Sequence, residues 1–442
     1  MTPPPGRSAD APHSEAITLE FEGTTNDGSI PFTRAKGKNK YRSNKKGRQY
    51  LLFGPNSSAL SGWAVYPISL VVPPRHPLPT CVSVDAHDPN SSRFMINYQL
   101  LGKTGLRVAD YCLGTMTFGD DWGWGAAKDE ARKIYDHYRE QGGNFIDTAN
   151  LYTNGTSEKF VGEFIAGHRG EVVIATKYTN AASGTNPNAA GNQRKSMMEA
   201  VEASLNRLQT DYIDLYWMHI WDQMTPVEEV MRAFDDLVRQ GKVLYIGISD
   251  APAWWVAKAN TLAELRGWTS FAGLQIEYNL NERTPERELL PMAKEFGLTL
   301  LAWSPLAGGV LTGKYLDAAP GGEKGRFATE GTEAMRKDKA HEDRVARAVI
   351  AVAKKLGVSA AQVALAWLRY ASVPVIPIIG AKKLTQLEDN LASAKVELSA
   401  VDIKSLNESS AITLGFPNNF YELPMVQTFV YGGLKERIKA RR

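Results

Sequence analysis

The stretch Asn144-Phe145-Ile146-Asp147-Thr148-Ala149-Asn150-Leu151-Tyr152 is a short apolar run that ends in an acid, with a tyrosine five residues further on. A helical pattern and the pair Gly142-Gly143 precede it, so the local sequence predicts a helix, a tight turn and a buried strand. A loop follows the strand, and in this loop a carboxylate and a phenol can face one another.

Two further apolar runs each end in a residue that handles protons. Residues 172–177 end in Lys177 and residues 212–219 end in His219, and one helical segment separates each run from the next. As successive parallel strands, the three runs place Asp147, Lys177 and His219 at one edge of a sheet, with Tyr152 beside them. In a (β/α) barrel this edge carries the chemistry.

Each of these four residues also has a structural interpretation when it is taken alone. Asp147 could cap the next helix, Tyr152 could belong to the core, Lys177 could be a solvated strand end and His219 a hydrogen-bonded core histidine. Their common position after three consecutive strands favours a catalytic cluster.

The order of these residues resembles that of the aldo-keto reductases. The family pattern D-T-A-x-x-Y, then a lysine that closes the next strand, then a histidine that closes the following one, is matched at Asp147, Tyr152, Lys177 and His219. The resemblance extends over about residues 95–442. It implies that Tyr152 is a general acid, that Lys177 and Asp147 tune it, and that His219 orients the substrate or shares its proton.

The chemistry of the cluster agrees with these roles. A phenol with an ordinary pKa of about 10 is a weak proton donor at neutral pH, and a neighbouring ammonium stabilises the phenolate. We therefore expect Lys177 to lower the pKa of Tyr152, and Asp147 to keep Lys177 charged and in place.

Helical and strand patterns alternate along the whole region. This alternation predicts an α/β fold, a closed parallel (β/α)8 TIM barrel. The expected strands lie at residues 111–118, 144–147, 172–177, 212–219, 243–248, 274–277, 298–303 and 373–378, and the expected helices near 128–141, 157–166, 195–208, 226–240, 252–265, 285–296 and 385–394. Residues 98–108 surround the turn signal 102–105 and predict a hairpin, which the resemblance places as a plug in the N-terminal mouth of the barrel.

The composition changes near residue 94. Residues 1–94 contain 12 of the 23 prolines and 11 Lys and Arg against 7 Asp and Glu, a net charge of +4, which leaves −1 for residues 95–442. We expect a disordered, Pro-rich, basic extension (1–94) followed by one barrel domain (95–442). The eight Lys and Arg of residues 34–48 could bind nucleic acid or an acidic surface, but their composition favours a solvated tail, so no nucleic-acid partner is expected.

Several other classes of protein have little support in the sequence. Residues 59–72 are apolar but short and interrupted by Pro67, so no membrane span is expected. Two cysteines, Cys81 and Cys112, cannot build a disulfide framework, and no H-x-x-x-H pair suggests a metal site. A cytoplasmic protein fits best, and its oligomeric state stays open.

No G-x-G-x-x-G motif is present, so a dinucleotide would bind differently from the way it does in a Rossmann fold. The resemblance implies a nicotinamide dinucleotide held at the ends of the later strands, and the adjacent Lys382 and Lys383, which suit a 2′-phosphate, favour NADP(H) over NAD(H). The implied cofactor residues are Ser249, Asp250 and Gln275 for the carboxamide, Trp303 for ring stacking, Ser304, Pro305, Leu306, Gly309 and Lys314 for the pyrophosphate, and Gly380, Lys382, Lys383, Gln386 and Asn390 for the 2′-phosphate and adenine. A lysine pair at a helix start is, however, also common on plain surfaces.

One cofactor position departs from the family pattern. Many members carry asparagine where this chain has Asp250, and an ionised aspartate accepts hydrogen bonds but cannot donate them. Its charge would favour the oxidised, cationic ring. Residues 317–340, polar and rich in glycine, could form a lid over the cofactor or a disordered insertion.

Aromatic residues surround the expected substrate site. Trp122, Trp124 and Trp221, together with the tail through Phe416, Phe420 and Tyr421, predict an aromatic rim suited to aryl or otherwise bulky aldehydes and ketones, although loop tryptophans could also just pack the mouth. The implied activity is NADPH-dependent carbonyl reduction. The alternative is an NADP-binding regulatory or redox-sensing subunit resembling potassium-channel β subunits.

Overall fold

The structure is a computed structural model that describes residues 96–180, 184–316 and 338–439, together with three short strands nearer the N-terminus. These strands, β1 (Lys40–Ser43), β2 (Gln49–Leu52) and β3 (Val65–Pro67), pair antiparallel in the order β1-β2-β3. The remaining residues of the 1–94 extension, and nearly all of the possible lid at 317–340, lie outside the described residues, so both expectations stay predictions.

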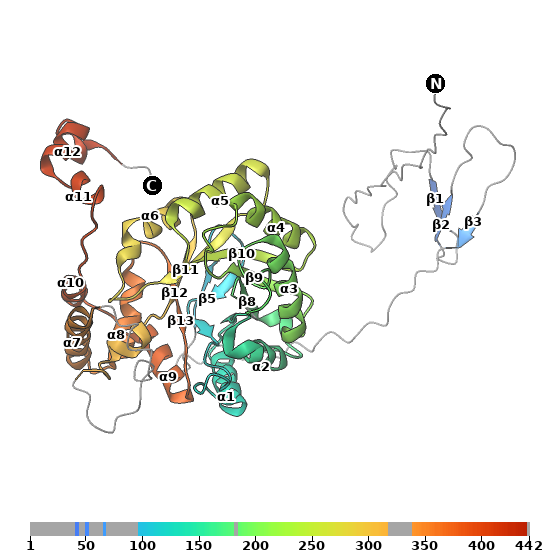
Figure 1. Cartoon of the computed structure of the whole chain (residues 1–442), viewed down its shortest axis with the longest axis horizontal. Helices are drawn as coiled ribbons and strands as arrows, with labels where there is room; N and C mark the ends of the chain where they lie inside the picture. Colours follow the sequence, from blue (N-terminus) through green and yellow to red (C-terminus); the bar gives the residue numbers. More distant parts are fainter. Residues whose placement is uncertain are drawn as a thin grey trace. The chain divides into compact units, whose positions relative to one another are not determined.

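Eight parallel strands close into a barrel, as the sequence predicts (Figure 1). Around the barrel the order is β10-β11-β12-β13-β6-β7-β8-β9. The strands are β6 (Cys112–Gly114), β7 (Phe145–Asp147), β8 (Val173–Tyr178), β9 (Ile213–Met218), β10 (Val243–Ser249), β11 (Phe271–Glu277), β12 (Thr299–Trp303) and β13 (Val375–Ile379).

Helices follow the strands and cover the outside of the barrel, except α11 and α12 near the C-terminus, which lie apart from it (Figure 1). The helices are α1 (Lys128–Glu140), α2 (Thr156–Phe164), α3 (Arg194–Leu208), α4 (Val227–Arg239), α5 (Ala253–Arg266), α6 (Leu289–Phe296), α7 (Lys339–Leu356), α8 (Ala360–Trp367), α9 (Leu384–Ala392), α10 (Ala400–Ser409), α11 (Asn418–Tyr421) and α12 (Pro424–Tyr431).

Apolar periodicity explains why these segments adopt their structures. In α4, Val230, Met231, Phe234 and Leu237 recur every three or four residues, and all four are buried against the barrel. Strands β8 and β9 are buried at every position, because side chains fill the interior and helices cover the exterior. The apolar pattern of each segment therefore decides whether it forms a buried strand of the barrel or an outer helix with one buried face.

A hairpin, β4 (Tyr98–Leu100) paired with β5 (Arg107–Ala109), precedes the barrel. Its turn lies at the N-terminal end of β12, where the Gly102 N–H donates to Thr299 Oγ1 at 2.7 Å, and Leu101 is fully buried. Gly102 has a φ of 55°, a conformation that glycine adopts without a steric penalty. The predicted hairpin is confirmed.

Two details of the barrel differ from the sequence expectation. The first strand is only Cys112–Gly114 rather than 111–118, because the chain turns after Thr115 and Phe118 returns to form an isolated bridge with Ala126. The helices α7 and α8 between β12 and β13 were not predicted, although Val345, Val349 and Val352 of α7 have helical spacing and are buried.

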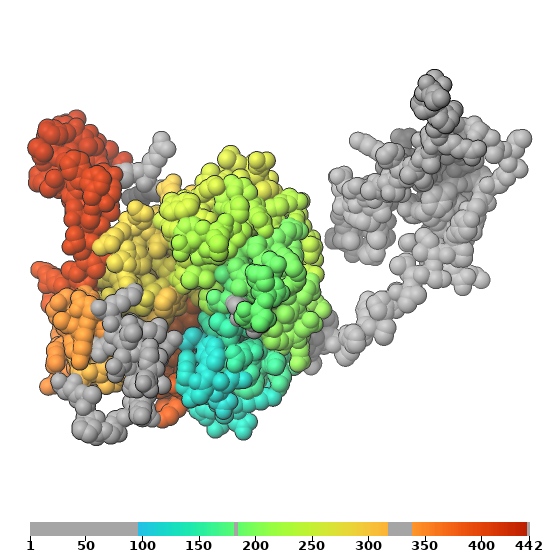
Figure 2. Space-filling model, in the orientation of Figure 1, coloured from blue at the N-terminus to red at the C-terminus, as the bar shows by residue number. Residues whose placement is uncertain are grey.

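By its contacts the chain divides into Met1–Asn90 and Ser91–Arg442, close to the predicted boundary at residue 94. Within the second unit, the C-terminal residues coloured red stand out as a lobe (Figure 2), and Phe416 and Phe429 there are 85% and 75% exposed. Among the described residues no single helix is long and apolar enough to cross a membrane, and one strongly bent pair, α7 with α8, passes the criteria of length and composition together.

Candidate active site

The barrel brings the four proton-handling residues to one edge. Asp147 is the last residue of β7, Lys177 lies in β8, and His219 follows β9 directly. These three strands are neighbours, since β8 pairs with both β7 and β9. Tyr152 begins a short 3₁₀ turn (Tyr152–Gly155) after β7, which carries its ring back over the strand ends.

Lys177 connects the cluster. Its side chain has no exposed surface, and its Nζ donates to Asp147 Oδ2, to the Thr148 carbonyl at 2.8 Å and to Tyr152 Oη at 3.0 Å. An ammonium has three hydrogens, so every donor is used. The carboxylate and the phenol are therefore joined through one buried cation.

The environment of the cluster changes the pKa of all four members. Burial raises the pKa of Asp147, although Lys177 and Gln275 act to lower it. Burial acts to lower the pKa of Lys177, but Asp147 and Tyr152 outweigh it, so the pKa of Lys177 is raised and the group stays charged. Burial raises the pKa of Tyr152 above its ordinary value, although Lys177 acts in the opposite direction. Lys177 thus acts on this phenol in the expected direction, but loss of water destabilises the phenolate more than the ammonium stabilises it, so the net pKa of Tyr152 lies above its ordinary value.

His219 packs against the phenol ring of Tyr152. The ring centroids of Tyr152 and His219 are 5.9 Å apart and the planes cross at 80°. Burial, and secondly the charge of Lys177, lowers the pKa of His219 well below its ordinary value, so the imidazole is neutral near pH 7. Its Nδ1 lies 2.8 Å from Asn180 Nδ2.

Gln275 belongs to the same cluster. It was expected only as a cofactor residue, but its Nε2 donates to Asp147 Oδ1 at 3.0 Å, and it is buried. Both carboxylate oxygens of Asp147 are thereby engaged. The 128-residue separation in sequence gave no indication of this contact.

Unusual backbone conformations gather at this edge of the barrel. Among the described residues, eight non-glycine residues have a positive φ, and seven of them follow barrel strands at the carboxyl ends: Thr153, Asn154, Thr179, Gln223, Asp250, Ser304 and Ala307. Such conformations cost free energy and persist where the surroundings enforce them. Their clustering makes this edge the candidate functional edge.

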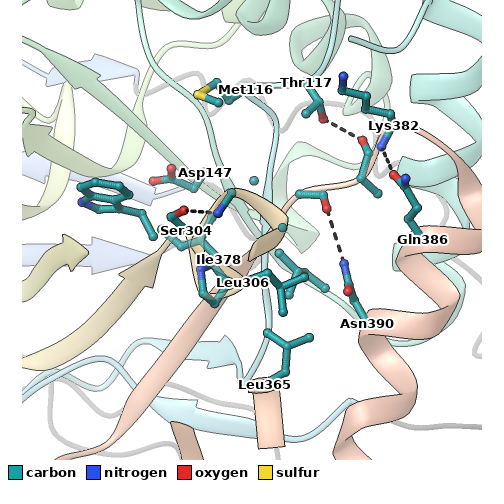
Figure 3. Close-up of a pocket in the computed structure, with 18 of the residues that line it drawn as sticks. Met116, Thr117, Asp147, Ser304, Leu306, Leu365, Ile378, Lys382, Gln386 and Asn390 are labelled. Atoms are coloured by element: carbon teal, nitrogen blue, oxygen red, sulfur yellow. Dashed lines mark hydrogen bonds between the residues drawn. The ribbon is translucent and has the colours of Figure 1, made fainter. Parts of the chain in front are cut away.

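A cavity of about 660 Å³ opens at the same edge (Figure 3). Asp147, Tyr152 and His219 line it, and Lys177 lies beneath them, outside the lining. Thirteen of the proposed cofactor residues also line the cavity: Ser249, Asp250, Gln275, Trp303, Ser304, Pro305, Leu306, Gly309, Lys314, Gly380, Lys382, Gln386 and Asn390. Lys383 is exposed and does not.

The polar part of this cavity is ordered by local contacts. The Trp303 indole Nε1 donates to Asp250 Oδ1 at 3.1 Å, and burial raises the pKa of Asp250 to about 6, against the opposing effects of Trp303 and Lys177. At the far end, Gln386 Oε1 accepts from the Lys382 backbone N–H at 2.8 Å, and Asn390 Nδ2 donates to the Gly380 carbonyl at 3.4 Å (Figure 3).

Sequence reasoning missed the part of the lining that comes from β6, α8 and β13. Thr117 Oγ1 donates to the Ala381 carbonyl at 2.7 Å across 264 residues of sequence (Figure 3). Leu365 and Ile378 contribute apolar surface. These residues have no motif, and only closure of the barrel brings them together.

The expected aromatic rim is only partly present. Trp124 lines the cavity and packs on Trp122 with ring centroids 5.8 Å apart, whereas Trp221 packs on Trp254 at 5.6 Å and lies outside the lining. The tail residues are exposed and do not line the cavity: Phe416, Phe420 and Tyr421. The expected contribution of the tail to the aromatic rim was wrong, because none of these three side chains borders the cavity.

No group of three histidine, cysteine, aspartate or glutamate side chains within the described residues could hold a metal ion. Cys112 is a buried free thiol in β6, and burial raises its pKa well above the ordinary value.

Comparison with known proteins agrees with this geometry. Residues 111–411 match the model of the aldo/keto reductase family. A norsolorinic acid reductase of Emericella nidulans is 43% identical over 331 residues, which cover 72% of this chain and 83% of that protein. An aryl-alcohol dehydrogenase [NADP(+)] of Phanerodontia chrysosporium is 38% identical over 336 residues, 72% of this chain and 87% of that protein.

A putative aryl-alcohol dehydrogenase of Saccharomyces cerevisiae is 36% identical over 336 residues, 73% of this chain and 88% of that protein. Each of these proteins is matched over most of its own length. The family model spans residues 111–411, which include the eight barrel strands and the four-residue cluster. The resemblance seen in the sequence is confirmed, and the chain belongs to the aldo/keto reductase family of oxidoreductases.

Proposed function

We propose that this enzyme is an NADP(H)-dependent carbonyl reductase that acts on aryl or similarly bulky aldehydes and ketones. The single observation that supports this best is the buried Lys177 ammonium, which joins Asp147 to Tyr152 at the wall of the cavity. A bound nicotinamide cofactor would supply the hydride.

The residues at one end of the cavity fit a nicotinamide carboxamide. Ser249 is buried and lines the cavity, and within the described part of the chain its Oγ has no hydrogen-bond partner. A buried hydroxyl without a partner costs free energy, and an amide from a ligand would satisfy it. Asp250, next in sequence, offers a second acceptor for the amide hydrogens.

The other end of the cavity fits an adenosine phosphate. Lys382 supplies a cation there, and Gln386 and Asn390, on one face of α9, add amide groups. A lysine beside the ribose favours a 2′-phosphate over a free hydroxyl. We therefore assign the cofactor as NADP(H) in preference to NAD(H).

The chain's own residues can carry the proton chemistry. Tyr152, whose pKa lies above that of an ordinary phenol, is protonated at neutral pH and can donate to the carbonyl oxygen. Lys177 then stabilises the phenolate that forms, and Asp147, held by Gln275, keeps Lys177 in place. Neutral His219 offers one further N–H to the same oxygen.

The support for an aryl or similarly bulky carbonyl substrate comes from the similar proteins. Trp124 borders the cavity next to Lys382, whose Nζ lies 5.0 Å from the centroid of its ring, so this tryptophan belongs to the cofactor end. The names of similar proteins speak of aryl alcohols and of norsolorinic acid. The particular substrate stays open.

The test is a direct assay of the purified protein. We expect loss of reduced-nicotinamide absorbance with NADPH and an aromatic aldehyde or ketone from a panel, and a slower reaction with NADH. A wild-type protein that binds NADPH tightly but reduces no carbonyl would contradict the proposal and favour a regulatory NADP-binding role.

Tyr152→Phe is the matched variant, because it keeps the ring and removes only the donor. General acid catalysis contributes about 10²–10⁴-fold, so turnover should fall by that factor while NADPH affinity and folding are retained. Turnover within a few-fold of the wild type would remove Tyr152 from the catalytic role.

A further inference from the structure

His219 can help a carbonyl substrate only if the correct ring nitrogen carries its hydrogen. A neutral imidazole has one N–H donor and one acceptor, and the partner of one nitrogen fixes the state of the other. In this structure the known partner is Asn180, whose Nδ2 lies 2.8 Å from Nδ1 of His219. An amide NH₂ only donates, so Nδ1 accepts and the hydrogen resides on Nε2.

The backbone around Asn180 is held in an unusual conformation. Thr179, immediately before it, has a φ of 102°, which is strained for a β-branched residue. The strain is supported by side-chain contacts, since Thr179 Oγ1 accepts from Asn192 Nδ2 at 2.9 Å and from the His219 backbone N–H at 3.3 Å.

Asn192 fastens this segment to the segment that follows β9. It is fully buried, and its Nδ2 also donates to the Ile220 carbonyl at 2.9 Å, while its Oδ1 accepts from the Asp222 N–H at 2.7 Å. The Asp222 carboxylate in turn accepts from the Asn192 backbone N–H at 2.8 Å. The residues after β8 and β9 are thereby locked together, with the Asn180 amide against the His219 ring.

We propose that Asn180 is a positioning residue that fixes His219 as the Nε2–H tautomer, so that His219 donates to the carbonyl oxygen beside Tyr152. This inference rests on the proposed function for its catalytic consequence, but the tautomer itself is a property of the free protein. Thr179 and Asn192 support the arrangement by holding Asn180 in reach.

The first measurement is a ¹⁵N spectrum of histidine-labelled protein without cofactor, assigned with His219→Gln. We expect the wild type to show His219 as neutral, with a hydrogen on Nε2 and none on Nδ1. Asn180→Asp should reverse this, because an isosteric carboxylate accepts instead of donating and draws a hydrogen to Nδ1. A wild-type spectrum with the hydrogen on Nδ1 would overturn the inference.

The second measurement is the pH profile of carbonyl reduction. In Asn180→Ala we expect kcat to fall by about tenfold to a hundredfold, the range found for residues that orient metal-bound histidines, with NADPH affinity unchanged. In Asn180→Asp, the new carboxylate should raise the pKa of His219 above its wild-type value. As the pH is lowered through this pKa, kcat should recover, since the doubly protonated ring regains Nε2–H. A merely structural role for Asn180 predicts no such recovery.

Asn188→Ala is the control. Asn188 lies between Asn180 and helix α3 in the sequence, is exposed, and makes no described side-chain contact with His219. It should match the wild type in both measurements. If Asn180→Ala keeps kcat within twofold and leaves the tautomer unchanged, the inference fails. If the spectra behave as expected but no carbonyl is reduced, the tautomer assignment stands and the proposed function fails.

Discussion

At the scale of single residues, the site depends on charges that are buried but fully partnered. An unpaired ammonium inside the barrel would be expelled or would lose its proton, whereas Lys177 has an acceptor for each hydrogen. The same burial that keeps Tyr152 protonated keeps His219 neutral. Water exclusion therefore sets the protonation states of this site as much as the individual partners do.

Asp250 gives the site a pH dependence that asparagine would lack. Its pKa of about 6 means that it is protonated below that pH and ionised above it. The ionised form should attract the cationic ring of NADP⁺, so NADP⁺ affinity should rise between about pH 5 and 7. If NADP⁺ binding lowers the pKa of Asp250 by one unit, NADP⁺ binds about tenfold more tightly to the ionised form than to the protonated form.

The test measures the dissociation constants of NADP⁺ and NADPH at several pH values by quenching of tryptophan fluorescence, and compares their ratio. The 2′-phosphate titrates in the same range but is common to both cofactors, so it largely cancels in the ratio. Asp250→Asn should flatten the pH dependence of the ratio. An equal dependence in wild type and variant would show that the Asp250 charge does not reach the ring.

The two adjacent lysines should differ in their effects on cofactor binding. Lys382 lines the cavity and Lys383 does not, so Lys382→Ala should weaken NADPH binding much more than NADH binding, and Lys383→Ala should change both little. Loss of a charge-assisted contact of about 1.5–3 kcal/mol corresponds to about one to two decades in affinity. Titration of both cofactors against both variants decides this, and equal weakening of NADPH and NADH in Lys382→Ala would contradict the assignment.

At the scale of helices and strands, buried ion pairs connect the outer helices to the barrel. Glu158 of α2 has no exposed surface, and it accepts from Arg207 Nε of α3 at 2.6 Å and from Thr176 Oγ1 of β8 at 2.6 Å. Two helices and the strand that carries Lys177 therefore meet at one carboxylate.

Arg207→Met should destabilise the protein because it leaves Glu158 buried without its cation. Breaking a buried pair from one side costs about 3–5 kcal/mol, so a clear fall in the melting temperature is expected. The control is Arg132→Met on α1, whose partner Asp136 is well exposed and whose pair contributes about 0.3–0.5 kcal/mol. Equal melting temperatures for the two variants would show that water reaches Glu158.

At the scale of the whole molecule, the catalytic unit is the barrel with its hairpin. The segment just before the hairpin is hydrogen-bonded to the C-terminal end of α1, where the Ile96 N–H donates to the Gln141 carbonyl at 3.0 Å. The division of the chain after Asn90 lies just upstream of this contact. The contacts described for the hairpin, the barrel and the cavity all lie within residues 96–439, so we predict that they form without the first 94 residues.

A protein that starts at Met95 should therefore fold and retain its turnover. It keeps every hydrogen bond of the hairpin, the barrel and the cavity described above. Thermal unfolding and carbonyl reduction are compared with those of the full chain. An insoluble or inactive product would show that the extension contributes to the barrel unit.

The sequence by itself determined the architecture and the order of the proposed catalytic cluster. Apolar runs alternating with helical patterns specify a barrel, because each strand needs burial on both faces and each helix on one. The four residues Asp147, Tyr152, Lys177 and His219 could be identified because they occupy equivalent places after successive strands. The hairpin was equally readable, since a glycine turn between short apolar runs has few other conformations.

Only the tertiary structure decided what depends on contacts between distant segments. Three hydrogen bonds of the site have no signal in the local sequence, because closure of the barrel brings their partners together. They join Gln275 to Asp147, Asn180 to His219 and Thr117 to Ala381. The raised pKa of Tyr152 is also a tertiary effect, since a sequence shows the charged neighbour but not the loss of water. Local patterns fix the elements, whereas burial and long-range contacts fix the protonation state and orientation of each group in the site.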